Sequence, residues 1–338
     1  MSKPSTSFLL LLSPKREHPI IPALLLFLVV NAIATAVFLL EGIDIKLPED
    51  GGIVPYVYQG PLVFGGAYAY LLFVIRLINN VHVKDFNKLL EFSDLDDQRK
   101  QEWNWKMLNH RSQWVETVIA VLVGIFHSYL QGPGKVFLGE STLVIYDLWR
   151  VLLNVTIWVM ITHSTSLFIR NMTLLNDLSR EVEIDLLNME KFMPLTRSGV
   201  WSILGFIGVY SIIFSQGVNH INLADPAILV LAPSIFFMIR TPLKGFRKRV
   251  IDAKETELGI IEAAIEGDRE ALKKSRIKAN LDNINVIDLI NYKKMIQNTF
   301  EIPVNIPTAS RFVFYLIIPI LTWVASSMVD KLIVFLIK

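Results

Sequence analysis

Long apolar blocks alternate with polar segments along the whole chain. A bilayer core about 30 Å thick is crossed by about 20 helical residues, because each residue of an α-helix rises about 1.5 Å. Most of the blocks approach that length, and we expect each to form one membrane-spanning helix. The pattern therefore predicts an all-α fold, a polytopic membrane helix bundle of about seven spans with cytoplasmic helical extensions. The predicted spans are Pro19–Leu40, Pro61–Ile78, Trp114–Leu130, Leu143–Ile169, Gly199–Ser215, Pro226–Ile239 and Phe312–Val329.

Positive charges lie in alternate polar segments. Of the 33 Lys and Arg residues, 28 lie in the N-terminal tail and in the segments 76–111, 170–197 and 240–311, whereas the intervening loops hold almost none. Basic residues close to membrane spans stay on the cytoplasmic side. We therefore expect a multi-pass protein of the cell membrane, plasma or inner, with its N-terminus in the cytoplasm and its C-terminus outside.

The spans and the charge pattern together divide the chain into four parts. The largest is a bundle of six spans, interrupted by two cytoplasmic helical segments. The parts are the cytoplasmic tail 1–18, the bundle 19–240 with its cytoplasmic segments 79–113 and 170–198, the cytoplasmic helical region 241–311, and the seventh span with the C-terminus, 312–338.

The cytoplasmic segments carry helix signals of their own. Ser93 is predicted to cap a helix that runs on into the third span, and the apolar stripe in Asn171–Met193 predicts a second helix. In 250–277 apolar residues recur every seven positions, but polar residues between them disfavour a continuous coiled coil. Gly267 predicts a helix end and a helical hairpin, and Asn285–Phe300 a further short helix. We expect these helices to pack on each other, on the membrane or on a neighbouring subunit.

The composition narrows the classes of function. Only 19% of residues are charged, against about 25% in soluble domains, and the net charge of +2 favours no nucleic-acid partner. The chain has no cysteine, which excludes disulfides, thiolate metal sites and cysteine nucleophiles. It has no phosphate-binding loop, no paired-histidine metal motif and no serine-hydrolase motif. We therefore expect no cofactor, no metal site and no enzymatic activity.

Four polar residues interrupt the apolar segment from Asp147 to Ser166. Asp147 and Arg150 lie three residues apart on one helix face, where they can form an ion pair in the outer headgroup layer. A short connection makes the third and fourth spans antiparallel neighbours, which places His127 at about the depth of Asp147. A cluster of His127, Asp147 and Arg150 is therefore one candidate polar site.

Asn154 and His163 lie deeper, inside any reasonable span. Such groups must face protein or water, and an ionisable group within the membrane is a candidate functional site. The alternative is hydrogen-bonded packing between helices, in which Asn154 contributes about 0.6 kcal/mol. The two residues are nine positions apart, which places them on opposite faces of an ideal helix and about 13.5 Å apart along its axis. On this geometry one helix face does not use both.

Two further features suggest function. Pro233 removes a backbone hydrogen bond from the short sixth span, and interrupted helices often line transport sites, although membrane helices also tolerate proline. A basic run follows that span and is either a topological anchor or a contact with anionic lipid. The run consists of Lys244, Arg247, Lys248 and Arg249.

Three functions fit these observations. The first is an ion channel or pore, built as a homo-oligomer through the cytoplasmic helices, in which buried polar groups line a path. The second is a secondary transporter of a small solute, indicated by Pro233, Asn154 and His163. The third is a membrane scaffold or sensor whose helical region binds a cytoplasmic protein. The first is preferred, because long internal helices accompany buried polar groups without any catalytic or nucleotide-binding motif.

Overall fold

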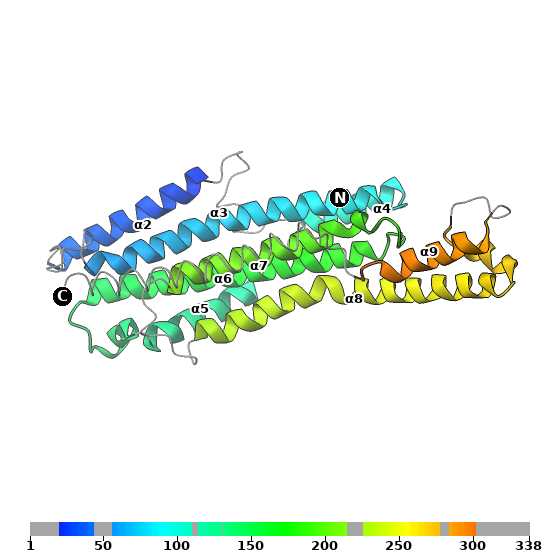
Figure 1. Cartoon of the computed structure of the whole chain (residues 1–338). Coiled ribbons are helices and arrows are strands. Elements are labelled where there is room, and N and C mark those ends of the chain that lie inside the picture. The colour runs from blue at the N-terminus through cyan, green and yellow to red at the C-terminus, as the bar shows by residue number, and fades with distance from the viewer. Residues whose placement is uncertain are drawn as a thin grey trace, which may run out of the picture.

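The structure, a computed structural model, is α-helical throughout the residues that it describes, which are 20–43, 56–109, 114–130, 132–214, 226–277 and 284–301. These residues form no β-strand, and the predicted all-α fold class is confirmed. Most helices run along one common axis (Figure 1). The elements are α2 Ile20–Leu40, α3 Tyr56–Glu91, α4 Asp97–Leu108, α5 Trp114–Leu130, η1 Pro133–Leu138, α6 Val144–Ser179, η2 Met189–Phe192, α7 Met193–Phe214, α8 Pro226–Ile265, η4 Arg269–Lys274 and α9 Val286–Asn298.

Within the described residues, three helices are long enough and apolar enough to cross a membrane. They are α2, α3 from Gly60 onward, and α6. The apolar α5 has only 17 residues. The described part of the chain therefore supports three spans by length and composition, fewer than the seven that the sequence predicts. The predicted fifth span up to Phe214 lies in α7 and the predicted sixth span lies in α8, whereas the predicted seventh span and the tail 1–18 lie outside the described residues.

Three helices continue well beyond a membrane thickness. α3 and α6 have 36 residues each and α8 has 40, which corresponds to about 54–60 Å at 1.5 Å per residue. The sixth predicted span and the helical region after it, which the sequence analysis separated at residue 240, are thus parts of one continuous helix, α8. α8 also runs through Pro233 without interruption, so the predicted helix break is wrong. Proline removes a single backbone hydrogen bond, and neighbouring turns can hold the helix together.

α6 is the central helix and contacts α2, α3, α4, α5, α7 and α8. One hydrophobic core surrounds its first half and includes Leu71, Ile75, Ile157 and Ile161. On the outside, α2 and α5 expose rows of large apolar side chains such as Leu24 and Leu122. Contiguous exposed apolar surface of this kind suits a lipid environment.

A second hydrophobic core lies at the other end of the long helices. It contains Phe86 of α3, Leu175 of α6, Phe192 of η2, Phe246 of α8 and Ile296 of α9, each nearly fully buried. The rings of Phe192 and Phe246 lie 4.7 Å apart. The helical extensions therefore pack on each other, one of the three arrangements that the sequence left open.

Two boundaries of α4 differ from the prediction. α4 is capped by Asp96, whose carboxylate accepts from the backbone N–H of Arg99 at 2.7 Å, whereas the Ser93 hydroxyl donates to the carbonyl of Leu90 at the end of α3. α4 also ends at Leu108 and does not continue into α5. Its end is stabilised from outside, because the guanidinium of Arg170 donates to the carbonyl of Asn109 at 2.6 Å.

The predicted helix over Asn171–Met193 is also shorter than expected, since α6 ends at Ser179. The guanidinium of Arg249 on α8 donates to the carbonyls of Ser179 and Val182 at 2.5 and 2.9 Å. A cation at a helix C-terminus satisfies carbonyls that have no partner within the helix and complements the helix dipole. A long-range contact therefore stabilises this helix end, and the local sequence pattern does not reveal it.

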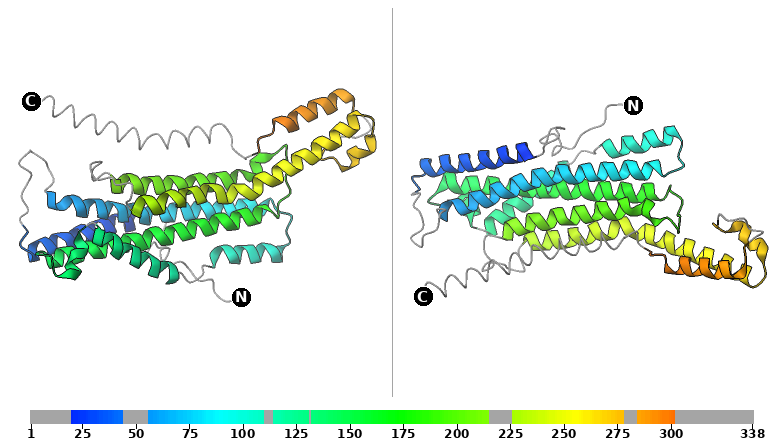
Figure 2. Two further views of the ribbon diagram at one scale, coloured as in Figure 1. Left: turned by 90° about the horizontal axis from the view of Figure 1, so that it is seen from below. Right: turned by 45° about the horizontal axis from the view of Figure 1, so that its top comes forward.

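The second core continues into an arm, defined here as α8 from Val250, η4 and α9. α8 ends before Gly267, which has a φ of +117°, and the predicted hairpin within 250–277 forms between α8 and the short η4. α9 also packs back along α8 (Figures 1 and 2). Asn285 and Asp288 form a reciprocal capping box at the start of α9. The arm extends past the ends of the neighbouring helices (Figure 1) and is inclined to the bundle (Figure 2).

Candidate functional site

The interface between α5 and α6 contains a hydrogen-bonded polar group in apolar surroundings. The Asn154 amide of α6 donates to the Ser128 hydroxyl at 2.9 Å and to the Gly124 carbonyl at 3.4 Å, both on α5. The Ser128 hydroxyl in turn donates to the Gly124 carbonyl at 2.8 Å. The helices meet closely here, because a Cβ placed on Gly124 would lie 2.6 Å from the Cα of Val155.

His127 extends this polar group and has two competing partners. Its Nδ1 lies 3.0 Å from the Asn154 Oδ1 and 3.0 Å from the Trp158 Nε1. The indole N–H only donates, so Nδ1 must accept from Trp158, whereas it must carry a proton to donate to the Asn154 oxygen. The two contacts require different protonation of Nδ1. His127 therefore has a hydrogen-bond partner whether Nδ1 is protonated or not.

His163 lies further along α6 and also contacts α5. Its Nε2 is 2.8 Å from the Thr117 hydroxyl, and its Nδ1 is buried with no hydrogen-bond partner among the described residues. Nearby, the Ser166 hydroxyl donates to the Glu116 carboxylate at 3.4 Å. Burying an imidazole nitrogen without a hydrogen-bond partner costs free energy, and binding of a water molecule or another polar group there would offset that cost.

The structure groups the predicted site residues differently from the sequence analysis. Asp147 pairs with Arg150 at 3.5 Å, as expected, and accepts from the Ser141 hydroxyl at 2.6 Å. The hydrogen bonds of His127 run instead to Asn154 and Trp158, so the structure does not bring the expected cluster of His127 with Asp147 and Arg150 together through these bonds.

Asn154 and His163, which the sequence analysis placed on opposite faces of α6, both bind α5. Their partners Ser128 and Thr117 are eleven residues apart, which places them on a common face of α5. α5 therefore contacts both residues from one face. The spacing of 100° per residue describes positions around one helix and carries no information on which neighbouring helix each position contacts.

A second buried polar cluster joins α3 and α7, and the sequence analysis missed it. Asp85 is fully buried, and its carboxylate accepts two hydrogen bonds from the Arg197 guanidinium and one from the Ser198 hydroxyl at 2.7 Å. The Arg197 side chain is 41% exposed, so only one member of the ion pair has lost its contact with solvent.

His82, one turn before Asp85 on α3, continues this cluster toward α6. Its Nε2 is 2.9 Å from the Ser202 hydroxyl of α7, and its Nδ1 is 3.4 Å from the amide nitrogen of Asn171 on α6. The Asn171 amide also donates to Asn79 at 3.2 Å. His82, Asn171 and Ser202 are all fully buried. In the sequence, the signal for this cluster was the spacing of three residues between His82 and Asp85. Both residues follow the predicted second span, in a polar segment where such side chains are expected to face water.

The basic run after the sixth predicted span divides among different partners. Arg247 forms an ion pair with Glu301 at 2.7 Å, Lys248 is exposed, and Arg249 binds the end of α6. Burial lowers the pKa of Arg249, with smaller contributions from the nearby charges of Arg180 and Arg276. The side chain of Lys244 lies outside the described residues. A contact with anionic lipid stays a prediction, which Lys248 is best placed to make.

The arm contains a buried carboxylate of its own. Glu257 of α8 accepts from the Ser275 hydroxyl, from the backbone N–H of Arg276 at 3.0 Å and from the Tyr292 hydroxyl at 3.1 Å. Burial, followed by the charge of Glu257, raises the pKa of the Tyr292 hydroxyl. Three donors from different segments satisfy one carboxylate, which connects α8, the chain after η4 and α9.

These residues define the candidate site as a series of buried polar groups centred on α6. Among the described residues, no group of three or more His, Asp or Glu side chains is arranged to hold a metal ion. Comparisons with protein-family models, with curated proteins and with solved structures find no match for this chain. The arrangement of side chains is therefore the basis for any functional assignment.

Proposed function

We propose that the protein is an integral membrane protein that conducts a small ion, as a homo-oligomeric channel, along the buried polar side chains of α6 in each subunit. The observation that carries this proposal is the distribution of buried polar side chains on that helix. They extend over 25 residues, or about 38 Å, which exceeds the thickness of a bilayer core. The residues are Asn154, His163, Ser164, Asn171, Asn176 and Ser179, each at most 7% exposed.

The energetics of the membrane support this proposal. Polar and ionisable side chains within a bilayer are costly, and in membrane proteins they commonly mark ion or proton pathways. On α6, Asn154 and His163 bond to α5 and Asn171 bonds to α3, so polar side chains recur at successive levels of the helix. Asn171 lies 3.4 Å from His82, which is one turn before Asp85, and the Arg197 partner of Asp85 is partly exposed. A fixed charge close to a polar series suits ion selection.

The proposal includes seven spans, an N-terminus in the cytoplasm and a C-terminus outside. The chain has no cysteine, so single cysteines can be introduced for labelling from either side of the membrane. With Glu49→Cys, we expect a membrane-impermeant maleimide to label intact cells. With Asp268→Cys, we expect labelling only after permeabilisation. Labelling of both positions from the same side would contradict this topology.

The proposed path is tested by ion flux from liposomes that contain the purified protein. We expect His163→Leu and Asn154→Leu to abolish flux or change its ion selectivity, because each removes a polar group from the α6 series without shortening the side chain greatly. The matched control is Thr173→Val, which removes an exposed hydroxyl that donates to the Ile169 carbonyl of its own helix. Unchanged flux in both leucine variants would contradict the proposed path.

A second candidate function, secondary transport coupled to protons, is favoured by His127. Its Nδ1 donates to Asn154 in one tautomer and accepts from Trp158 in the other, so the proton can change nitrogen without loss of a hydrogen bond at Nδ1. Such a side chain suits a relay that passes protons between polar groups within a membrane. Electrical recording separates the two functions, since a channel gives discrete single-channel currents, and a transporter instead gives uptake that requires a proton gradient.

A further inference from the structure

A carboxylate lies at the end of the α5–α6 interface that is nearer the second core. Glu116, in the first turn of α5, is only partly exposed, and the Ser166 hydroxyl of α6 donates to it at 3.4 Å. No ion pair within the described residues involves Glu116. The basic residue one turn after Ser166 is Arg170, whose guanidinium donates instead to the carbonyls of Lys106 and Asn109. The charge of Glu116 is therefore available to an approaching cation.

The next residue of α5, Thr117, brings His163 to the same place. The Thr117 hydroxyl lies 2.8 Å from Nε2 of His163, and Glu116 is close enough for its charge to act on the imidazole. The His163 side chain is 4% exposed, and its Nδ1 has no hydrogen-bond partner among the described residues. When the Nε2–H donates to the Thr117 oxygen, Nδ1 presents a free lone pair. A buried proton acceptor thus lies beside an unpaired carboxylate.

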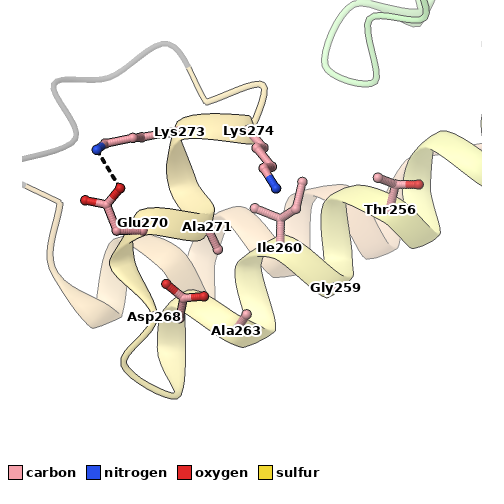
Figure 3. Close-up of a pocket in the computed structure, with 9 residues that line it drawn as sticks. All are labelled: Thr256, Gly259, Ile260, Ala263, Asp268, Glu270, Ala271, Lys273 and Lys274. Atoms are coloured by element: carbon pink, nitrogen blue, oxygen red, sulfur yellow. Dashed lines mark ion pairs between the residues drawn. The ribbon is translucent and has the colours of Figure 1, made fainter.

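The charged cavity of the arm does not offer this combination. That cavity, of about 550 Å³, lies between α8 and η4, and its rim carries Asp268 and Glu270 beside Lys273 and Lys274 (Figure 3). Glu270 is paired with Lys273 at 2.5 Å, as the dashed line in Figure 3 marks. Charges of both signs line this cavity, and its lining residues include no histidine.

The atoms at the α5–α6 interface indicate which ion fits there. The charge of Glu116 disfavours an anion. Alkali and alkaline-earth cations bind oxygen ligands, whereas the unpartnered atom of His163 is an imidazole nitrogen. Imidazole suits transition metals, but no group of three or more His, Asp or Glu side chains in the described part of the chain is arranged to hold one. A proton needs no further ligand, because it binds an imidazole nitrogen directly.

We propose that the permeant ion is the proton, and that Glu116 and His163 pass it into the α5–α6 interface from the cytoplasmic side. This inference rests on the proposed channel and names its ion. The Glu116 carboxylate takes up a proton and releases it to Nδ1 of His163, which forms the imidazolium. The proton on Nε2 then leaves toward the Thr117 hydroxyl, so one proton has entered, one has left and both side chains regain their charge. Acidic and histidine side chains form proton relays in other membrane proteins.

Proton entry into liposomes that contain the purified full-length protein tests the inference. A pH-sensitive dye inside the liposomes reports the flux, and a potassium gradient with valinomycin supplies the driving potential. Glu116→Gln still accepts from Ser166 but cannot take up a proton, and His163→Gln still bonds to Thr117 but has no basic nitrogen. Each is expected to lower proton flux by about 100-fold, the lower end of what a positioned proton-transfer group contributes.

Glu102→Gln is the matched control. Glu102 of α4 is also only partly exposed, and it makes no hydrogen bond to α5 or α6 within the described residues. This variant is expected to keep the proton flux of the wild type. Glu116→Asp retains a carboxylate and is expected to carry more protons than Glu116→Gln. Wild-type proton flux in both glutamine variants at the predicted site would overturn the proposal, and so would an equal loss in Glu102→Gln.

Potassium and chloride flux from the same preparations separates this inference from the proposed function. If the wild type carries potassium or chloride but no protons, the assignment of the proton is wrong and the channel proposal stands. If it carries none of the three ions, the channel proposal fails, and the proton pathway fails with it.

Discussion

Replacing Arg197 by methionine is expected to lower the free energy of unfolding by roughly 3 kcal/mol. Asp85 is fully buried, and without the guanidinium its carboxylate would keep the Ser198 hydroxyl as a donor but lose its opposite charge. Breaking a buried ion pair costs about 3–5 kcal/mol, and the lower end applies because Arg197 is 41% exposed. Unfolding in a titration with denaturing detergent, followed by tryptophan fluorescence, measures the change.

Arg180→Met is the matched control for this experiment. Arg180 also pairs with an aspartate, Asp177 at 3.9 Å, but both side chains are largely exposed. Exposed ion pairs contribute about 0–1 kcal/mol, so the same substitution here is expected to change stability by less than about 0.5 kcal/mol. Equal effects of the two substitutions would show that burial of Asp85 has no energetic consequence.

Gly124→Ala is expected to lower the free energy of unfolding by about 1–3 kcal/mol, the cost of overpacking a close contact. The added Cβ would lie 2.6 Å from the backbone of Val155, so α5 and α6 must separate. Their separation lengthens the hydrogen bonds of Asn154 to α5 and is expected to reduce ion flux as well. Unfolding and flux are measured in the same preparations.

Gly60→Ala serves as the control, because its Cβ would meet nothing within 4 Å on α3. Alanine is the better helix former by about 1 kcal/mol, so this variant is expected to be slightly more stable than the wild type. A stabilised Gly124→Ala protein would show that α5 and α6 do not meet as closely as described here.

The candidate site was partly predictable because burial in a membrane follows from sequence position. Asn154 and His163 lie in the middle of an apolar block, and the structure buries both. Asp85 and Arg197 were not predicted, because each lies in a polar segment where charged residues normally face water. The two residues are 112 positions apart in the sequence, and only the packing of α3 against α7 brings them together.

Helix ends likewise divide into those that the local sequence predicts and those that a distant residue stabilises. The capping box of Asn285 and Asp288 is local, since both residues lie within one turn, and the sequence predicted a helix there. The end of α6 at Ser179 depends on Arg249, 70 residues later, and the end of α4 involves Arg170 from α6. A basic residue after a span therefore has two roles that sequence alone does not separate, a topological signal and a cap for a distant helix.

The sequence by itself determined the helical class, the apolar blocks and the hairpin of the arm. These features depend on the hydrophobicity and backbone preference of residues close together in the chain, which a linear pattern records. The tertiary structure decided how far each helix runs beyond its apolar block, which polar groups meet and which charges are buried. Those features depend on where one helix crosses another, and a one-dimensional pattern contains no information on crossing. His163 was identified from its position along one helix, but only the packing of α5 against α6 provides its partner.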